Sequence, residues 1–338
     1  MRDTGNQNWP ELADEVRAIL RCPFCKSALQ DEVGGLACLQ CGKRFPLRNG
    51  VLRFVASEHY AGSFGFQWRK HERTQLDSPS SRRSETDFTR KTGLTREDLA
   101  GKLVLDAGSG MGRYADVVHR WGARVVAVDL SAAVEAAARN LASRPDVTVI
   151  QADAHALPFA PESFDYIYSL GVLHHTPNCD LAFKALPRLL KPGGGIAIWL
   201  YSAYNRWYRM SDLYRKLTRH MPARLLYSLC YLAVPLYHVH AVLKKAPLVG
   251  RRASGALALL LPMSFEPDSQ WRWLDTFDWY SPRYQSKHTY EEVFRWFEDC
   301  GLEHVHAAEV PVSVRGTRPP QVNLAAHEAE PEVARCAE

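Results

Sequence analysis

The stretch "KLVLDAGSGMGRYADVV", residues 102–118, predicts a buried strand, a glycine-rich turn and a helix that begins near Arg113. Glycine is needed where the backbone adopts a positive φ or approaches a ligand closely. The spacing departs from the dinucleotide pattern G-x-G-x-x-G, and no Lys-Ser/Thr pair follows, as it would in a P-loop. The turn alone therefore does not identify the nucleotide. Its small residues are Gly108, Ser109, Gly110 and Gly112.

Residues 101–200 alternate short β-branched runs with helical patterns. The expected strands are VLDAG, VVAVD, VTVIQAD, FDYIYSL and IAIWLY, and "LLKPGG" is expected to form the turn before the last of them. Such alternation is typical of a parallel sheet covered by helices on both faces. The fold class that the sequence predicts is therefore α/β.

Acidic residues lie at or near the carboxyl ends of the first three strands. Asp106 can accept hydrogen bonds or hold an ammonium group, and Asp129 is placed where an acid binds both hydroxyls of a ribose. Asp153 can face the amino group of an adenine. Together they outline a crevice for an adenosine that carries a charged amino-acid tail, because an acidic rim disfavours a diphosphate.

This ordered set resembles the class I S-adenosylmethionine-dependent methyltransferases, which have a Rossmann-like sheet. "VLDAGSGMGRYA" matches their first motif, "VVAVDLS" the second, "QADAHALPF" the third, and "FDYIYSLGVLHH" with "LLKPGG" the fourth and fifth. The resemblance is close over residues 101–201 and looser over 289–315. It is nearest to enzymes that act on quinone precursors and small molecules. The Asn/Asp-Pro-Pro-Tyr motif of enzymes that methylate amino groups of nucleic-acid bases is missing after the fourth strand.

The resemblance implies S-adenosyl-L-methionine as the cofactor and assigns a part of it to each motif. Asp106 and the glycines would hold the methionine moiety, Asp129 the ribose, and Asp153 with Ala154 the adenine. The full set of implied cofactor-binding residues is Asp106, Gly108, Ser109, Gly110, Gly112, Asp129, Leu130, Asp153, Ala154 and Leu170.

Two C-x-x-C pairs lie near the N-terminus, Cys22 with Cys25 and Cys38 with Cys41, and twelve residues separate the pairs. Four thiolates in two such knuckles can converge tetrahedrally on Zn²⁺, and the absence of an open ligand position favours a structural site. A mononuclear iron site and free redox thiols are the alternatives. The segment resembles the small zinc-ribbon proteins that partner methyltransferases, so docking, substrate recognition and support all remain open as its role.

Three histidines are candidates for a catalytic base, which methyl transfer needs only if the acceptor must lose a proton. His174 and His175 follow the fourth strand, near the expected position of the sulfonium. An alternative is that one of them packs against the cofactor while the other caps the next helix. His288 precedes a helix that starts near Thr289, and the aromatic stretch "FDWYSPRYQSKHT" before it is typical of a substrate wall or a buried lid.

The chain from residue 202 to residue 286 forms an insertion after the fifth strand. Its residues 225–243 include nineteen positions without a charge, and basic residues flank them on both sides. This length reaches the range of a membrane span, but spanning would separate the last two strands of the sheet from the first five. Two interpretations remain, a buried helical lid over the active site and a lid that also rests on a membrane surface.

Composition supports a globular chain, with 46% hydrophobic and 23% charged residues and a net charge of +5. No apolar signal-peptide region follows the first charges, so we expect a cytoplasmic protein with peripheral contact at the inner membrane surface. The oligomeric state is not indicated. The expected divisions are a zinc ribbon (1–56), a linker with N-terminal lid helices (57–100), a methyltransferase domain (101–318) and a flexible tail (319–338).

The sequence thus predicts an enzyme that transfers a methyl group to oxygen or carbon of a hydrophobic small molecule or lipid-linked acceptor. A second hypothesis is an RNA methyltransferase that grips nucleic acid with the ribbon, which the moderate charge and the uncharged lid disfavour. A third is a non-catalytic scaffold that docks a partner through the ribbon.

Overall fold

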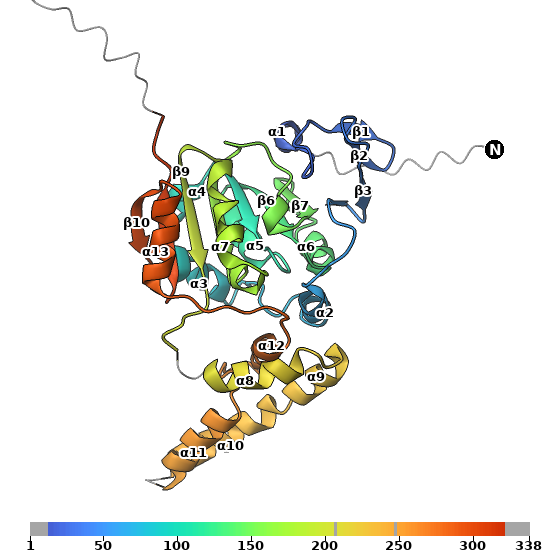
Figure 1. Ribbon diagram of the computed structural model, residues 1–338. Coiled ribbons are helices and arrows are strands. Elements are labelled where there is room, and N and C mark those ends of the chain that lie inside the picture. Colours follow the sequence, from blue (N-terminus) through green and yellow to red (C-terminus); the bar gives the residue numbers. More distant parts are fainter. Residues whose placement is uncertain (1–12, 206–207, 247–248, 322–338) are drawn as a thin grey trace, which may run out of the picture.

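The computed structural model describes residues 13–205, 208–246 and 249–321, so most of the expected tail lies outside the described residues (Figure 1). Within these residues the strands form one sheet in the order β1-β2-β3-β4-β7-β6-β5-β8-β9-β11-β10. Neighbours from β4 to β9 run parallel, and both ends of the sheet are antiparallel. The predicted Rossmann-like α/β class is confirmed.

The five predicted strands are all present and form the parallel centre of the sheet. Alternate residues of β5 face opposite sides, so Leu103 and Leu105 join one hydrophobic core while Val104 joins the other. A strand buried on both faces needs such a continuous apolar run. The bounds are β5 Leu103–Ala107, β6 Arg124–Asp129, β7 Val147–Gln151, β8 Phe164–Leu170 and β9 Leu190–Trp199.

The "LLKPGG" segment differs from its prediction, because most of it is already part of β9. Phe164 pairs with Leu190 and Tyr166 pairs with Gly195, so the strand accommodates the extra residues as an irregularity in register. Gly195 allows this packing, since a Cβ there would lie 2.3 Å from the Tyr166 ring.

Helices cover both faces of the sheet, as the alternating pattern predicts (Figure 1). The core on one face includes Phe88 of α3 and Val117 of α5, and the core on the other face includes Phe183 of α7 and Phe297 of α13. The helices outside the insertion are α1 Asp14–Ile19, α2 Gly62–Lys70, α3 Arg83–Thr92, α4 Arg96–Leu99, α5 Arg113–Arg120, α6 Ala133–Asn140, α7 Cys179–Lys184 and α13 Tyr290–Asp299.

The cysteine-bearing segment continues the central sheet. Its strands are β1 Gln30–Glu32, β2 Gly35–Ala37, β3 Arg44–Arg48 and β4 Val51–Arg53. Asn49 and Gly50 connect β3 to β4 with φ of 52° and 75°, the positive values that a tight hairpin turn requires. β4 then pairs in parallel with β7, with Leu52 opposite Ile150. The ribbon and the larger domain therefore share one sheet.

The opposite end of the sheet is closed by strands from the end of the chain. β11 Ser313–Thr317 lies between β9 and β10 Glu303–Ala307 and is antiparallel to both. α13 begins at the predicted position, with the Thr289 hydroxyl accepting a hydrogen bond from the backbone N–H of Glu292. The looser second block of the resemblance thus completes the sheet.

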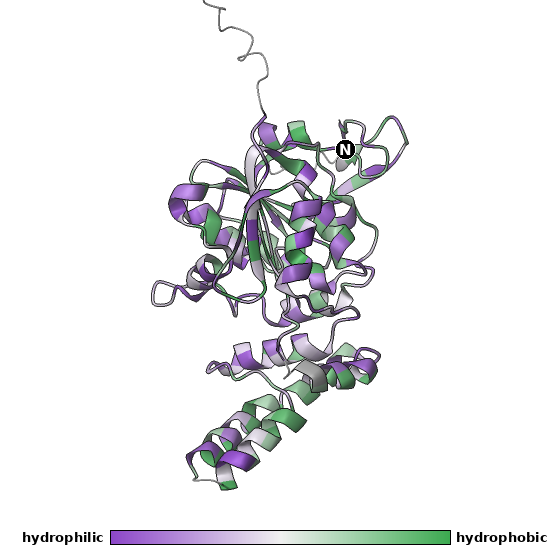
Figure 2. Ribbon diagram, turned by 60° about the vertical axis from the view of Figure 1, so that its left-hand side comes forward, coloured by the Kyte–Doolittle hydropathy of each residue, from purple (hydrophilic) through white to green (hydrophobic). Residues whose placement is uncertain are grey.

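The insertion forms helices on the side of the sheet where the parallel strands end (Figure 1). α12 lies directly against the domain, whereas α10 and α11 form a hairpin that projects away from it (Figure 2). The helices are α8 Tyr208–Thr218, α9 Ala223–Cys230, α10 Ala233–Lys245, α11 Val249–Leu260 and α12 Ser269–Tyr280. Only α12 therefore has the position of a lid.

Of the two interpretations of the uncharged run, a helical lid buried over the active site is wrong, and a lid that also rests on a membrane surface is not tested. Residues 223–245 have a mean hydropathy of 1.4, and only 17% of their most apolar window is buried. By length and composition alone this segment could cross a membrane, which is weak evidence for a span. The apolar residues were placed correctly on helices, but they face outward and not onto the active site.

Candidate active site

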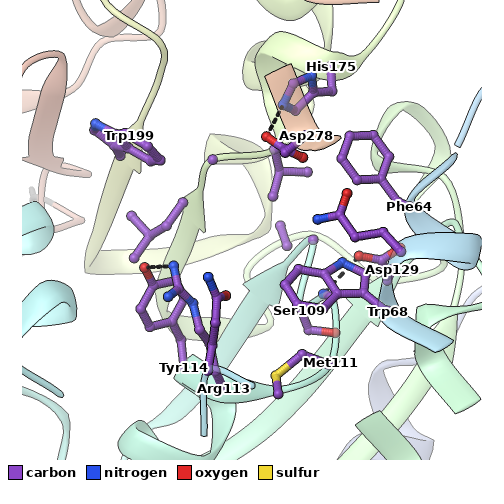
Figure 3. A pocket seen from close by; sticks show the side chains of 18 of the residues that line it. Phe64, Trp68, Ser109, Met111, Arg113, Tyr114, Asp129, His175, Trp199 and Asp278 are labelled. Carbon is purple, nitrogen blue, oxygen red and sulfur yellow. Dashed lines mark hydrogen bonds and ion pairs between the residues drawn. The ribbon is translucent and has the colours of Figure 1, made fainter. Parts of the chain in front are cut away.

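A cavity of about 760 Å³ opens at the carboxyl ends of the central strands, between the glycine turn, α2, α3 and α12 (Figure 3). β5 lies between β6 and β8, so the strand order reverses at this point. Open α/β sheets bind their ligands at such a switch point. The volume is in the range of sites that enclose a small organic ligand.

The glycine turn after β5 has the backbone that the sequence predicts. Gly108, Gly110 and Gly112 have φ of 97°, 54° and 89°. A Cβ on Gly108 would lie 2.3 Å from Val172, and one on Gly110 would lie 3.2 Å from the Trp68 indole nitrogen. Side chains at these positions would therefore fill the floor of the cavity or displace its wall.

Asp129 ends β6 and lines the cavity, and the turn holds its carboxylate in place. One oxygen accepts a hydrogen bond from the backbone N–H of Gly110 at 2.9 Å, and the other accepts two from Ser131, at 2.8 Å from the backbone N–H and 2.7 Å from the hydroxyl. These bonds fix both oxygens before any ligand is present. A carboxylate oriented in this way is suited to accept hydrogen bonds from the two hydroxyls of a ribose.

Asp106 lies behind the turn and is only 1% exposed. Its Oδ2 has no hydrogen-bond partner among the described residues. The pKa of this carboxyl is raised to about 8, mainly by burial and in part by the neighbouring Asp129, whereas the Tyr168 hydroxyl and Arg113 oppose the shift. A buried carboxyl with an unpaired oxygen favours a cationic ligand group, which fits the ammonium of a methionine moiety.

Most of the predicted cofactor residues come together around this cavity. Asp106, Gly112 and Asp153 do not line it themselves: Gly112 precedes α5 and packs near Leu141, and Asp153 accepts hydrogen bonds from His155. The predicted residues that line the cavity are Gly108, Ser109, Gly110, Asp129, Leu130, Ala154 and Leu170.

Of the three predicted catalytic histidines, only His175 lines the cavity. His174 is fully buried and stacks on the Tyr201 ring at 4.0 Å, and burial lowers its pKa well below the usual value. His288 is buried elsewhere, where its Nε2 lies 2.7 Å from the Ser286 hydroxyl. Neither His174 nor His175 caps the following helix, because the side chain of Asn178 does so.

His175 is held between two parts of the chain that are far apart in sequence. Its Nδ1 lies 3.1 Å from the carbonyl oxygen of Tyr284, and its Nε2 lies 4.0 Å from Asp278 of α12. The dashed line in Figure 3 marks this contact between His175 and Asp278. The hydroxyl of Tyr201 donates a 2.6 Å hydrogen bond to Asp278. Burial lowers the pKa of His175, whereas the Asp278 carboxylate acts in the opposite direction. The imidazole is therefore neutral near pH 7 and able to accept a proton.

The sequence did not identify several residues that complete the cavity. No role is predicted for the aromatic residues at positions 64–68, and in the structure Phe64 and Trp68 of α2 form one wall. The aromatic stretch near residue 280 is typical of a substrate wall or a buried lid, and its Asp278 and Trp279 line the cavity. Only the abundance of aromatic residues gave a signal for these positions, because no spacing rule links them to the glycine turn.

The sequence also did not identify two cations, Lys91 and Arg113, at one end of the cavity. Lys91 of α3 is buried, donates to Asp87 at 2.8 Å and lies over the Trp199 ring at 3.7 Å. Arg113 donates to the Tyr114 hydroxyl, and its Nη1 has no hydrogen-bond partner among the described residues. Both cations contact the Asp87 carboxylate and also interact with Asp275, but the unpaired Nη1 of Arg113 can still donate a hydrogen bond to an anionic group such as a carboxylate.

The four cysteines form a compact cluster at the other end of the molecule. Their sulfur atoms all lie within 4.8 Å of one another, with 3.6 Å between Cys22 and Cys41 and 3.3 Å between Cys25 and Cys38. Tetrahedral zinc with Zn–S bonds of about 2.3 Å places its sulfur ligands about 3.8 Å apart. The spacing and donor set therefore fit a single Zn²⁺ ion.

Comparison with known proteins gives separate matches for the domain that contains the cavity and for the segment that contains the cysteine cluster. Residues 105–198 match the family model described as "Methyltransferase domain", and residues 16–50 match "Trm112p-like protein". Part of the chain is 38% identical over 114 residues to a ubiquinone biosynthesis O-methyltransferase of Pseudomonas entomophila. That match covers 33% of this chain and 48% of the relative. A demethylmenaquinone methyltransferase of Thermobifida fusca is 40% identical over 106 residues, 30% of this chain and 45% of the relative.

The chain therefore spans about half the length of the curated relatives it matches. Among solved structures, a complex between the Haloferax volcanii Trm112 methyltransferase activator and a putative methyltransferase is similar at 14% identity and a TM-score of 0.45. It covers 75% of this chain and 94% of that chain. Residues 16–50 are therefore similar to the Trm112p-like proteins, and residues 105–198 are similar to the methyltransferase domain family.

Proposed function

We propose that the protein transfers the methyl group of S-adenosylmethionine to an oxygen or carbon atom of a hydrophobic small molecule or lipid-linked acceptor. The observation that carries this proposal is the cavity at the carboxyl ends of β5, β6 and β8, which joins a rim suited to adenosine to an aromatic wall. The named activities of the two relatives, in ubiquinone and menaquinone biosynthesis, favour an apolar acceptor of the quinone type.

The cofactor would contact three parts of the cavity. Asp129 would accept hydrogen bonds from the ribose hydroxyls, Leu130 and Ala154 would contact the adenine, and the glycine turn, with Asp106 buried behind it, would hold the methionine moiety. When bound, S-adenosylmethionine supplies an electrophilic methyl group on a sulfonium. The buried cations Lys91 and Arg113 would attract its carboxylate or an anionic group of the acceptor.

His175 is our proposed general base for a hydroxyl acceptor. A neutral imidazole can take the hydroxyl proton on Nε2 as the new bond to the methyl group forms. The resulting imidazolium would be stabilised by Asp278, which Tyr201 orients. Phe64 packs against the His175 ring at 4.9 Å and restricts its movement. His174 and His288 would support this region through packing and would not contact the acceptor.

The cysteine cluster would hold a structural zinc ion, because four thiolates leave no ligand position open. We propose that the protein acts in the cytoplasm, at the inner surface of the membrane, where an apolar acceptor is concentrated. The Trm112p-like segment would support the methyltransferase domain through the shared sheet.

The test is a transfer assay with S-adenosylmethionine labelled in its methyl group, the pure protein and an extract of the source cells. Products are separated into organic-extractable, RNA, protein and aqueous fractions. Label in the organic phase supports the proposed acceptor. Label in RNA instead favours the nucleic-acid hypothesis, and cofactor binding without any transfer to any fraction favours a scaffold. A His175→Gln variant serves as the control for signal that depends on the cavity.

A further inference from the structure

The α10–α11 hairpin carries an apolar surface that the rest of the described chain does not cover. Many of its large apolar side chains are about half exposed or more, although the protein has a core in which comparable residues are buried. Isolated exposed apolar residues are ordinary, but a contiguous set marks an interaction site. The exposed residues of the hairpin are Val239, Val242, Val249, Leu259 and Leu260, with Leu261 directly after it, and α9 and the turn before α10 add Leu225, Leu229, Tyr231 and Leu232.

These residues follow a helical pattern. Leu225 and Leu229 are four residues apart on α9, and Val239 and Val242 are three apart on α10, so each pair lies on one side of its helix. On α11, Gly250, Ser254 and Ala258 are buried at spacings of four and face α10. The small inward residues allow the two helices to pack closely, so the larger residues remain outside.

The segment from residue 213 to residue 265, which includes the hairpin, carries basic residues and no acidic ones. Residues 213–265 contain no Asp or Glu in 53 positions, but they contain eight Lys and Arg residues. Four of these, Lys244, Lys245, Arg251 and Arg252, are exposed around the turn between α10 and α11. Such a run leaves the positive charge without compensation from neighbours in sequence. An apolar helix surface with Lys and Arg at its margin is suited to an anionic lipid interface.

The hairpin is connected to the cavity through α12. The buried Arg272 of α12 lies over the Tyr237 ring of α10 at 3.9 Å, and Trp273 of α12 donates a 2.7 Å hydrogen bond to the carbonyl of Tyr227 on α9. The same helix contributes Trp271, Leu274 and Asp278 to the cavity. The hairpin and α12, which lines the cavity, thus lie at the same end of the molecule (Figure 1).

We propose that the α10–α11 hairpin is the membrane-docking element of this protein and binds a bilayer that contains anionic phospholipid. The basic turn would contact lipid head groups, and the exposed apolar side chains would enter the interfacial region. Docking would hold the α12 side of the cavity near the membrane. That this delivers an acceptor rests on the proposed function, whereas the docking itself does not.

The test uses the full-length protein and sedimentation with phosphatidylcholine vesicles, prepared with and without phosphatidylglycerol. We expect binding to the anionic vesicles that weakens as salt is raised. The double variant Lys244→Glu/Lys245→Glu should bind about tenfold more weakly or worse, and so should Arg251→Glu/Arg252→Glu. The matched control is Arg69→Glu/Lys70→Glu, which reverses two exposed basic residues on α2 and should bind like the wild type.

A second pair of substitutions tests the apolar part of the surface. Val242→Asn and Leu260→Asn alter exposed side chains, so folding is retained, and we expect less binding at high salt, where the charges are screened. The proposal is overturned if the wild type stays in the supernatant with anionic vesicles or if the hairpin and control variants bind equally. It is also overturned if the hairpin substitutions disrupt a dimer of the protein and leave vesicle binding unchanged, since the surface would then bind a second copy. Vesicle binding needs no methyl transfer, so the two proposals can fail separately.

Discussion

At the scale of single residues, Asp129 is a carboxylate whose two oxygens are both held in position by hydrogen bonds. It accepts hydrogen bonds from Gly110 and Ser131 and still lines the cavity. We expect Asp129→Ala to weaken binding of S-adenosylhomocysteine by about tenfold or more, because hydrogen bonds to a charged group contribute about 1.5–3 kcal/mol. Titration calorimetry measures this affinity.

The same substitution leaves the N–H groups of Gly110 and Ser131 without their acceptor, so a lower melting temperature is also expected. Asp129→Asn separates the two effects, because it keeps one acceptor oxygen. Asp146→Ala, at an exposed position before β7, is the control for loss of a carboxylate. An affinity that stays at the wild-type value in Asp129→Ala would rule out the ribose assignment.

The interaction between His175 and Asp278 predicts a shift in the pH profile of methyl transfer. Asp278 raises the pKa of His175 against the effect of burial, so Asp278→Asn should lower that pKa further. The acidic limb of the kcat profile should then move to lower pH, and the plateau should fall by about 10–100-fold because the imidazolium loses its partner. Initial rates across the pH range measure both. An unchanged acidic limb, with Asp180→Asn as the surface control, would exclude His175 as the base.

At the scale of elements, the four-cysteine cluster lies beside short strands of the ribbon. β1 and β2 have three residues each, too few to be stable without another constraint. We expect Cys22→Ser/Cys25→Ser to lose about one equivalent of zinc, as a single four-cysteine site implies. Emission spectrometry of the purified protein measures the metal content. Cys179→Ser removes a cysteine outside the cluster and should retain the metal, whereas full zinc content in the double variant would disprove the site.

The helices of the insertion show where prediction from the sequence ends. The apolar run was sufficient to predict helices, but its side chains face outward because α12, and not α10, packs on the domain (Figure 1). An apolar run has the same composition whether it covers a core or meets a membrane. The glycine turn was predictable in detail, since positive φ restricts its residue types. The role of Asp278 was not predictable, because its contact with His175 joins two segments about a hundred residues apart. Only the fold brings these segments together.

At the scale of the whole molecule, two buried carboxyls make stability depend on pH. Burial raises the pKa of Asp106 to about 8 and that of Asp275 to about 7, from an ordinary 3.8. Between the ordinary and the raised value the unfolded chain is ionised while the folded chain is protonated, so stability falls as pH rises. Burial lowers the pKa values of His71, His174 and His175, which opposes this effect below about pH 6.5. The melting temperature of the cofactor-free protein should therefore decrease from about pH 7 to about pH 8.

Differential scanning calorimetry over this range measures the effect. Asp106→Asn should flatten the dependence, because an amide does not titrate, and Asp146→Asn should leave it unchanged. A melting temperature that rises steadily with pH in the wild type would contradict the prediction. Binding of a ligand ammonium to ionised Asp106 should oppose the decrease, so a cofactor analogue should stabilise the protein more at high pH.

An α/β sheet with five parallel strands could be predicted from the sequence, but the full order of the strands in the sheet could not. The five parallel strands follow from alternating patterns in residues 101–200, where local sequence determines each element. The pairing of β4 with β7 could not be predicted, because Val51–Arg53 is only three residues long and reads equally well as the end of a separate ribbon. Strands this short acquire their partner from the fold around them.

That pairing has a consequence for how the chain is kept soluble. Without β4, β7 would be the outermost parallel strand and would present a row of unpaired backbone groups to other molecules. Because the strand that covers this row belongs to the same polypeptide, each newly made copy carries its own cover in a fixed one-to-one ratio. Production of the methyltransferase domain therefore needs no matched supply of a second protein to protect this edge.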